Sequence, residues 1–211
     1  MSDVDVSSLL TWGVAMLTLP GEKESGDLHV VKPVGSGVLA AVVDGLGHGA
    51  EAASAARAAV AVLERHADES PLPLLQRCHR ALIGTRGVVL SLAFFDGAGG
   101  GGSMTWVGVG NVEGVLLHAA AGARPARTTL VTRGGIVGSE LPPVRAQVCA
   151  VAPGDTVILA TDGITRHFAD GLPRDAAPQH LADHILSRYG KGTDDALVLV
   201  ARYAGGAGMM A

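Results

Sequence analysis

Residues 37–49, GVLAAVVDGLGHG, join an apolar run to one aspartate, Asp44, and then to a loop in which glycine alternates with Leu and His. The run from Gly37 to Val43 has the length and composition of a buried strand. A strand that ends in a carboxylate, followed by glycine backbone able to approach a ligand closely, is typical of a metal or phosphate site. Taken alone, the same residues also fit a tight strand-to-helix turn in which Asp44 caps the helix.

The hydrophobic pattern on either side of this stretch predicts further strands and helices. Strands are expected at residues 10–19, 28–32, 88–95, 104–109, 114–118, 128–132, 145–151, 156–160 and 196–203, and helices at 50–66, 72–83 and 178–189. This order indicates an α+β fold with antiparallel sheets. Two stacked sheets with helices outside them would cover such apolar strands on both faces. We expect one domain over residues 1–211.

The composition limits the classes of function. A hydrophobic fraction of 48% is enough for a substantial core, and the net charge of −4 gives no basic surface for nucleic acid. No apolar run reaches the roughly 20 residues of a membrane span, and the first ten residues contain no basic side chain. We therefore expect a cytoplasmic protein with neither a nucleic-acid nor a membrane partner. Cys78 and Cys149 lie far apart without a CxxC spacing, so we expect both to be reduced core residues.

Carboxylates recur at four predicted strand boundaries. They are Asp27, Asp44, Asp162 and the pair Asp194 and Asp195. Each alone fits a turn or a helix cap, but strand ends can converge on one edge of a layered protein, where the carboxylates would repel one another unless cations lay between them. Such oxygen ligands suit Mg²⁺ or Mn²⁺, and two ions about 3.5–4 Å apart could activate a water for hydrolysis. The sequence thus predicts metal-assisted hydrolysis.

Four motifs in this order resemble those of the PPM family of metal-dependent serine/threonine protein phosphatases, the type 2C group. The motifs are SGD at 25–27, VVDGLGHG at 42–49, ATDGIT at 160–165 and TDDALVLV at 193–200. The resemblance implies a four-layer αββα sandwich and two Mn²⁺ or Mg²⁺ ions. Within the family the chain is most similar to a small phosphatase of the bacterial general stress pathway. That similarity implies phosphorylated STAS-domain proteins of the stressosome, RsbS-like or RsbR-like, as substrates and partners.

The resemblance also implies a role for each motif residue. Asp44 would bridge both ions and the Gly45 carbonyl would hold one of them. The other implied metal ligands are Asp27, Asp162, Asp194 and Asp195, with Asp195 at a position that varies within the family. Asp27, Asp44, Asp162 and Asp194 form the implied catalytic set.

The chain departs from the family at several positions. Many members hold a third ion through two aspartates at the places that Asn111 and Arg166 occupy here, so two ions are expected. Arg166 could bind phosphate or be an exposed residue, and His48 could donate a proton to the leaving oxygen or be a solvated loop residue. The alternative to an active phosphatase is a catalytically weak PPM-like module that binds a signalling partner.

Overall fold

The computed structural model describes residues 9–97, 102–120, 122–173 and 175–205, which form two five-stranded antiparallel sheets and three helices. The first sheet has the order β1 (Leu10–Leu17), β10 (Ala196–Tyr203), β9 (Thr156–Ala160), β6 (Glu113–Leu117) and β7 (Arg127–Leu130). The second has the order β2 (Asp27–Val34), β3 (Gly37–Gly45), β4 (Val88–Asp96), β5 (Ser103–Val109) and β8 (Gln147–Ala150).

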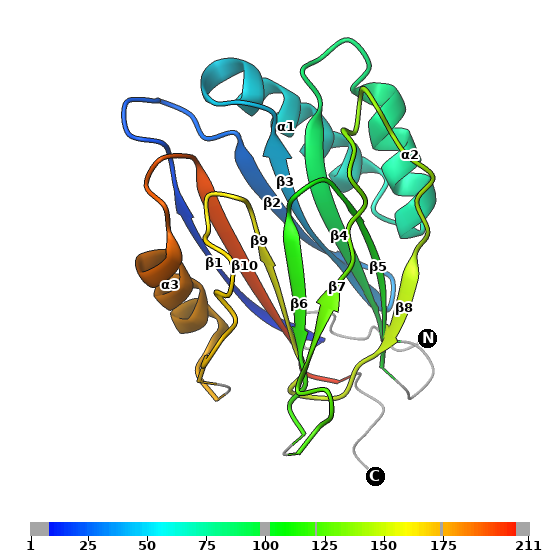
Figure 1. Ribbon diagram of the computed structural model, residues 1–211. Coiled ribbons are helices and arrows are strands. Elements are labelled where there is room, and N and C mark those ends of the chain that lie inside the picture. The colour runs from blue at the N-terminus through cyan, green and yellow to red at the C-terminus, as the bar shows by residue number, and fades with distance from the viewer. Residues whose placement is uncertain (1–8, 98–101, 121, 174, 206–211) are drawn as a thin grey trace.

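The helices cover the outer faces of the two sheets, so the molecule has four layers (Figure 1). Helices α1 (Gly49–Arg65) and α2 (Pro71–Ala81) lie on the second sheet, and α3 (Pro178–Tyr189) lies on the first. Both α2 and α3 begin with proline, whose fixed φ suits a first helical residue that needs no amide donor. This arrangement confirms the predicted αββα sandwich.

Strand β3 shows why the run from Gly37 to Val43 is apolar throughout. Successive side chains point to opposite faces of a sheet, so a strand covered on both faces reads as a continuous apolar run. Val38, Ala40 and Val42 pack into the core between the two sheets. Leu39, Ala41 and Val43 pack into a second core under α1 and α2. A third core lies between the first sheet and α3.

Helix α1 rests on this sheet through alanine. Its buried side includes Ala52, Ala53, Ala55, Ala56 and Ala59, and such small side chains let the helix backbone approach the strands closely. Gly45 at the end of β3 depends on that approach, because a Cβ there would lie 2.2 Å from the Ala52 carbonyl oxygen. The glycine after Asp44 is therefore required by packing against the helix.

The predicted elements differ from the observed ones mainly at edges. The strand expected at 145–151 is confined to β8, an edge strand that alternates between half-buried and exposed residues. Cys149 lies on it, half-buried and packed against the core between the sheets, whereas Cys78 of α2 is fully buried; both thiols are free. Within the described segments, no helix is long and apolar enough to cross a bilayer.

Candidate metal and catalytic site

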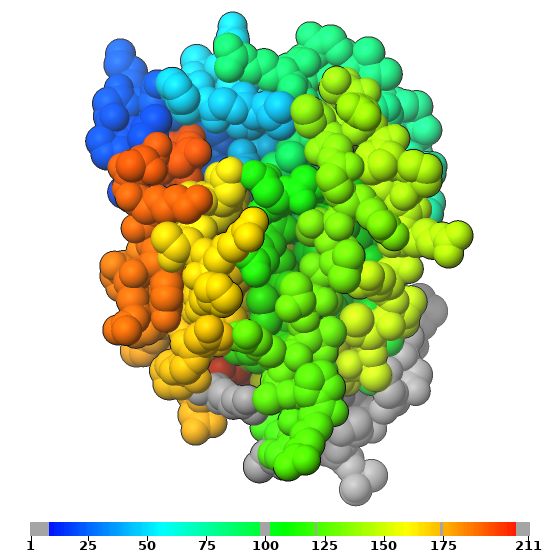
Figure 2. Space-filling view, in the orientation of Figure 1, coloured from blue at the N-terminus to red at the C-terminus, as the bar shows by residue number. Residues whose placement is uncertain are grey.

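All five predicted aspartates line one cleft of about 550 Å³. Each lies at a strand end on the same edge of the sandwich: Asp27 begins β2, Asp44 is near the end of β3, Asp162 follows β9, and Asp194 and Asp195 precede β10. Segments distant in sequence meet at this edge, where the loop before β2, the start of α1 and the segment before β10 lie side by side (Figure 2). The structure therefore brings together carboxylates from both sheets.

Antiparallel pairing explains why the carboxylates of each sheet lie at the same end of that sheet. Asp27 and Asp44 are direct register partners in the β2–β3 ladder. In the other sheet, β9 ends where β10 begins, because Ala160 pairs with Val198. Each sheet thus contributes its carboxylates at one end, and the stacking of the sheets decides whether the two ends meet.

Thr161 connects the two ends across the interface between the sheets. Its buried hydroxyl donates to Oδ2 of Asp27 at 2.7 Å and accepts the Leu197 amide at 2.8 Å. The Thr161 amide in turn donates to the Leu197 carbonyl at 3.0 Å. One side chain therefore sets the position of Asp27 relative to β10.

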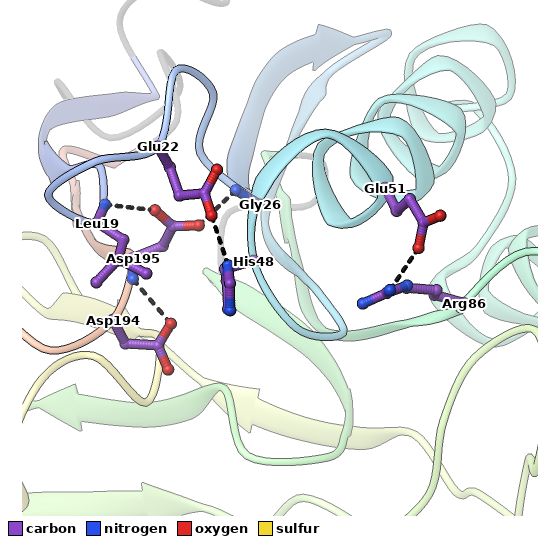
Figure 3. A network of polar contacts seen from close by, with 8 residues as sticks. All are labelled: Leu19, Glu22, Gly26, His48, Glu51, Arg86, Asp194 and Asp195. Carbon is purple, nitrogen blue, oxygen red and sulfur yellow. Dashed lines mark hydrogen bonds and ion pairs between the residues drawn. The ribbon is translucent and has the colours of Figure 1, made fainter.

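Asp195 joins the loop between β1 and β2 to the start of β10. Oδ1 accepts the amide of Leu19 and Oδ2 accepts the amide of Gly26, both at 2.7 Å (Figure 3). These two amides lie at opposite ends of the loop, so one buried carboxylate holds both ends. The neighbouring Asp194 accepts the Asp195 amide at 2.9 Å through Oδ1 and lies at the cleft surface.

Asp162 has donors on two sides. The Asn111 side-chain amide donates to Oδ2 at 2.7 Å, and the Lys191 ammonium donates to the Asp162 carbonyl oxygen. Asn111 therefore places an N–H donor, not a carboxylate, against this aspartate. Arg166 is exposed and lines an adjoining groove together with Lys191; it is not among the residues that line the aspartate cleft.

Burial, together with the charges of neighbouring aspartates, raises the pKa values of three carboxyl groups. Burial, followed by the charges of Asp27 and the other aspartates, raises the pKa of Asp44 to about 9. Burial also raises the pKa of Asp27 to about 7, although the Thr161 hydrogen bond acts in the opposite direction. The pKa of Asp162 is raised chiefly by burial and by Asp194, while Lys191 and Asn111 counteract the rise. Ionising these carboxyl groups together, without cations between them, therefore costs free energy.

The donor atoms in the cleft are those that hard divalent cations prefer. Carboxylate oxygens from four strand ends form an oxygen-rich set without thiolate ligands. Gly45, at the end of β3, is buried and is not among the residues that line the cleft. Over the ranges that the structure describes, no three Asp, Glu, His or Cys side chains already stand in a metal-holding arrangement. The five carboxylates nevertheless line one space.

His48 also lines this cleft, immediately before α1. Its Nδ1 lies 2.6 Å from Oε1 of Glu22, which belongs to the loop held by Asp195 (Figure 3). Sequence reasoning singled out His48 but not Glu22, Thr161 or the amides bound by Asp195. Of these, only Thr161 could have been found from the sequence, because it directly precedes the predicted ligand Asp162.

An αββα sandwich with carboxylates gathered at one end of its stacked sheets defines the class of PPM, or type 2C, phosphatase domains. The model of one family within that class, Stage II sporulation protein E (SpoIIE), matches residues 35–204. The chain belongs to this family. No curated protein sequence matches the chain.

Solved structures agree with this assignment. A protein described with the bacterial stressosome, a modular system adapted to control secondary messenger signalling, is 32% identical with a TM-score of 0.81, covering 92% of this chain and 99% of its own. RsbX in complex with magnesium has a TM-score of 0.82 at 21% identity, over 97% and 100% of the two chains. The catalytic domain of the serine/threonine phosphatase PstP with two manganese ions has a TM-score of 0.66 at 18% identity, over 93% and 99%. The last two show a shared fold.

Proposed function

We propose that this protein is a metal-dependent phosphoserine/phosphothreonine protein phosphatase that acts on STAS-domain proteins of a stressosome-type signalling complex. The observation that carries the proposal is the meeting of five aspartates from four strand ends in one cleft. Membership of the SpoIIE family and the 32% identical stressosome protein support it. RsbX with magnesium supports the choice of metal, as does PstP with two manganese ions.

Two Mn²⁺ or Mg²⁺ ions fit the oxygen donors of the cleft. Asp44 would be a ligand of both ions, as the family resemblance implies, and burial and the charges of the other four aspartates raise its pKa. The other proposed ligands are Asp27, Asp162, Asp194 and the Gly45 carbonyl. When bound, the ions supply an activated water for in-line attack on phosphorus and neutralise charge on the phosphoryl oxygens.

The protein supplies the position of each ligand. Thr161 holds one oxygen of Asp27, and Asn111 holds one oxygen of Asp162, which leaves the other oxygen of each carboxylate for a cation. Asp195 has a different part in the proposal, because both of its oxygens accept amides of the loop that leads into Asp27. Its ligation of a metal remains a prediction from the family resemblance. We propose two ions and not three, because Asn111 stands where many family members have an aspartate for a third ion, and its amide nitrogen faces Asp162.

The decisive experiment measures phosphate release from phosphorylated STAS-domain proteins and from p-nitrophenyl phosphate. Both substrates are incubated with the purified protein in Mn²⁺ and, separately, after chelation. Release from both that depends on Mn²⁺ and is absent in Asp44→Asn is the expected result. Stable binding of the phosphorylated STAS protein without release of phosphate would instead identify a PPM-like binding module. Hydrolysis confined to the small substrate would contradict the proposed protein substrate.

A further inference from the structure

A groove of about 740 Å³ adjoins the aspartate cleft. Gly110, Asn111 and Asp162 line both spaces, so a substrate chain whose phosphate lies in the cleft would have its neighbouring residues at the groove. The volume is within the range of about 300–1,000 Å³ that is usual for ligand sites. The reaction proposed above uses the cleft alone and gives the groove no role.

Two cationic side chains, Arg166 and Lys191, line this groove. Among the described residues, the exposed Arg166 has neither a hydrogen bond nor an ion pair, although Glu113 of β6 lines the same groove. Lys191 is anchored at the border between the groove and the cleft, where its ammonium donates to the Asp162 carbonyl oxygen. A guanidinium presents a fork of N–H donors that matches a carboxylate. Arg166 therefore offers an anion site next to the proposed metals.

The backbone holds the two cations on neighbouring segments. Arg166 lies after β9 and Lys191 lies before β10. The Thr165 amide donates to the Tyr189 carbonyl at 2.8 Å, and the Lys191 amide donates to the Gly163 carbonyl at 2.9 Å. These bonds tie the cations to the same framework that carries the aspartate after β9. Their place relative to the cleft is thus set by the fold.

The opposite wall of the groove comes from β7 and the residues that follow it. Thr129, Thr132 and Val131 line this wall, and Val131 is 55% exposed. β7 is an edge strand of the first sheet, and the segment after β9 lies beside β6 and β7 on the face shown in Figure 2. The wall therefore offers hydroxyl groups and one apolar contact to an extended segment of a substrate.

The charges around the groove favour an acidic side chain there. The chain has a net charge of −4, and five carboxylates line the neighbouring cleft. A substrate that carries acidic residues near its phosphate is repelled by most of this surface. Arg166 and Lys191 reverse the sign locally, so attraction is confined to an acidic residue that reaches the groove.

We propose that this groove binds the residues of the protein substrate next to its phosphoserine or phosphothreonine, and that Arg166, with Lys191 beside it, selects an acidic side chain there. The inference rests on the phosphatase function proposed above and adds the kind of sequence that the enzyme prefers around the phosphate. Arg166 takes no part in breaking the bond to phosphorus. Its contact is the same in the ground state and the transition state, so it acts on KM and leaves kcat to the cleft.

The test uses short phosphoserine peptides whose flanking residues are all neutral except for one aspartate, which is moved one position at a time along both sides. With the wild-type protein in Mn²⁺, aspartate at one or two positions should lower KM by about fivefold relative to the neutral peptide, the upper range for an exposed ion pair. Raising NaCl to about 0.5 M should weaken this preference, because the charges are exposed. The kcat values of the peptides should agree.

A charge reversal identifies the residue that reads the aspartate. Arg166→Glu should lose the preference for aspartate and prefer lysine at the same peptide position, since the two charges are exchanged. Arg145→Glu is the matched control, because Arg145 is also exposed but lies before β8 and lines neither the groove nor the cleft. Its ratio of KM values for the neutral and aspartate peptides should equal that of the wild type.

The outcomes separate this inference from the function on which it rests. Equal KM values for the aspartate and neutral peptides in the wild type would overturn the groove as a selecting site and leave the phosphatase function standing. Equal losses on both peptides in Arg166→Glu would place Arg166 at the phosphoryl group and overturn its role as the selecting residue. A wild-type protein that hydrolyses none of the peptides in Mn²⁺ would refute the phosphatase function, and this inference with it.

Discussion

Asp27 and Asp44 face each other as register partners at the end of the β2–β3 ladder. Partners in an antiparallel ladder place their side chains on the same face of the sheet, and like charges directly opposite one another are destabilising. The β2–β3 ladder therefore sets up a repulsion that a cation would relieve.

Asp44→Asn should stabilise the metal-free protein at pH 8 while abolishing its Mn²⁺-dependent turnover. The pKa of Asp44 is raised from 3.8 to about 9 in the folded protein, so the stability that this group contributes is full below about pH 4 and falls as the pH rises from about 4 to about 9. Asparagine carries no charge and avoids that loss. We expect the free energy of unfolding to rise by an amount on the order of 1–3 kcal/mol at pH 8. Each kcal/mol corresponds to a rise of roughly 2–4 °C in Tm for a protein of this size. Thermal unfolding in EDTA should show the gain shrinking toward pH 4; a gain independent of pH would contradict this origin.

Mn²⁺ should stabilise the wild-type protein against heat, and EDTA should reverse the effect. A ligand that binds only the folded state adds about 2.7 kcal/mol at a concentration 100 times its Kd. Because the cleft carboxylates repel one another without cations, the increase in Tm should be larger at pH 8 than at pH 5. Asp44→Asn serves as the control and should respond weakly. A Tm that Mn²⁺ leaves unchanged in the wild type would argue against a metal site in this cleft.

Thr161→Val should destabilise the protein and weaken metal-dependent activity together. Valine keeps the shape but removes the hydroxyl that donates to Asp27 and accepts the Leu197 amide. Leaving a buried donor without a partner costs about 1–3 kcal/mol, and the pKa of Asp27 should rise further without the hydrogen bond that lowers it. Urea unfolding measures the loss. Thr161→Ser retains the hydroxyl and should lie closer to the wild type than Thr161→Val does.

Asp195→Asn and Asp194→Asn should separate a positioning residue from a ligand. Asparagine has one acceptor oxygen, so Asp195→Asn loses an amide bond of Leu19 or Gly26 and should cost about 1.5–3 kcal/mol, the range for hydrogen bonds to a charged group. Two ions should still bind. Asp194→Asn should bind fewer ions with little loss of stability. Calorimetric Mn²⁺ titration with urea unfolding distinguishes the cases, and a reversed pattern would make Asp195 the ligand.

The predicted secondary structure agrees closely with the observed elements because the strands are covered on both faces. Continuous apolar runs such as 37–43 and 196–201 leave little doubt about burial, and both are central strands. The strand expected at 145–151 is where prediction was least accurate. It is an edge strand with one exposed face, so apolar content is a weaker guide to its length and to the burial of Cys149.

The place of the aspartates at strand ends was readable from the local chain, whereas their partners were not. A carboxylate after an apolar run marks a strand end wherever that strand lies in the fold. The donors to Asp27 and Asp195 come from positions 134 to 176 residues away. No local pattern carries such information, because those contacts depend on which sheet stacks on which and in what register.

Alternation, apolar runs and strand-end chemistry are local properties of the chain, so the layers, the motifs and the residues at the shared edge could be predicted without coordinates. The folded structure was needed to see that both oxygens of Asp195 bind amides, that Thr161 bridges the sheets to Asp27, and that Glu22 contacts the ring of His48. Such contacts escape a local pattern because a hydrogen bond requires atoms within about 3 Å in the right direction. Only the packed arrangement of both sheets and the loop between β1 and β2 sets those distances.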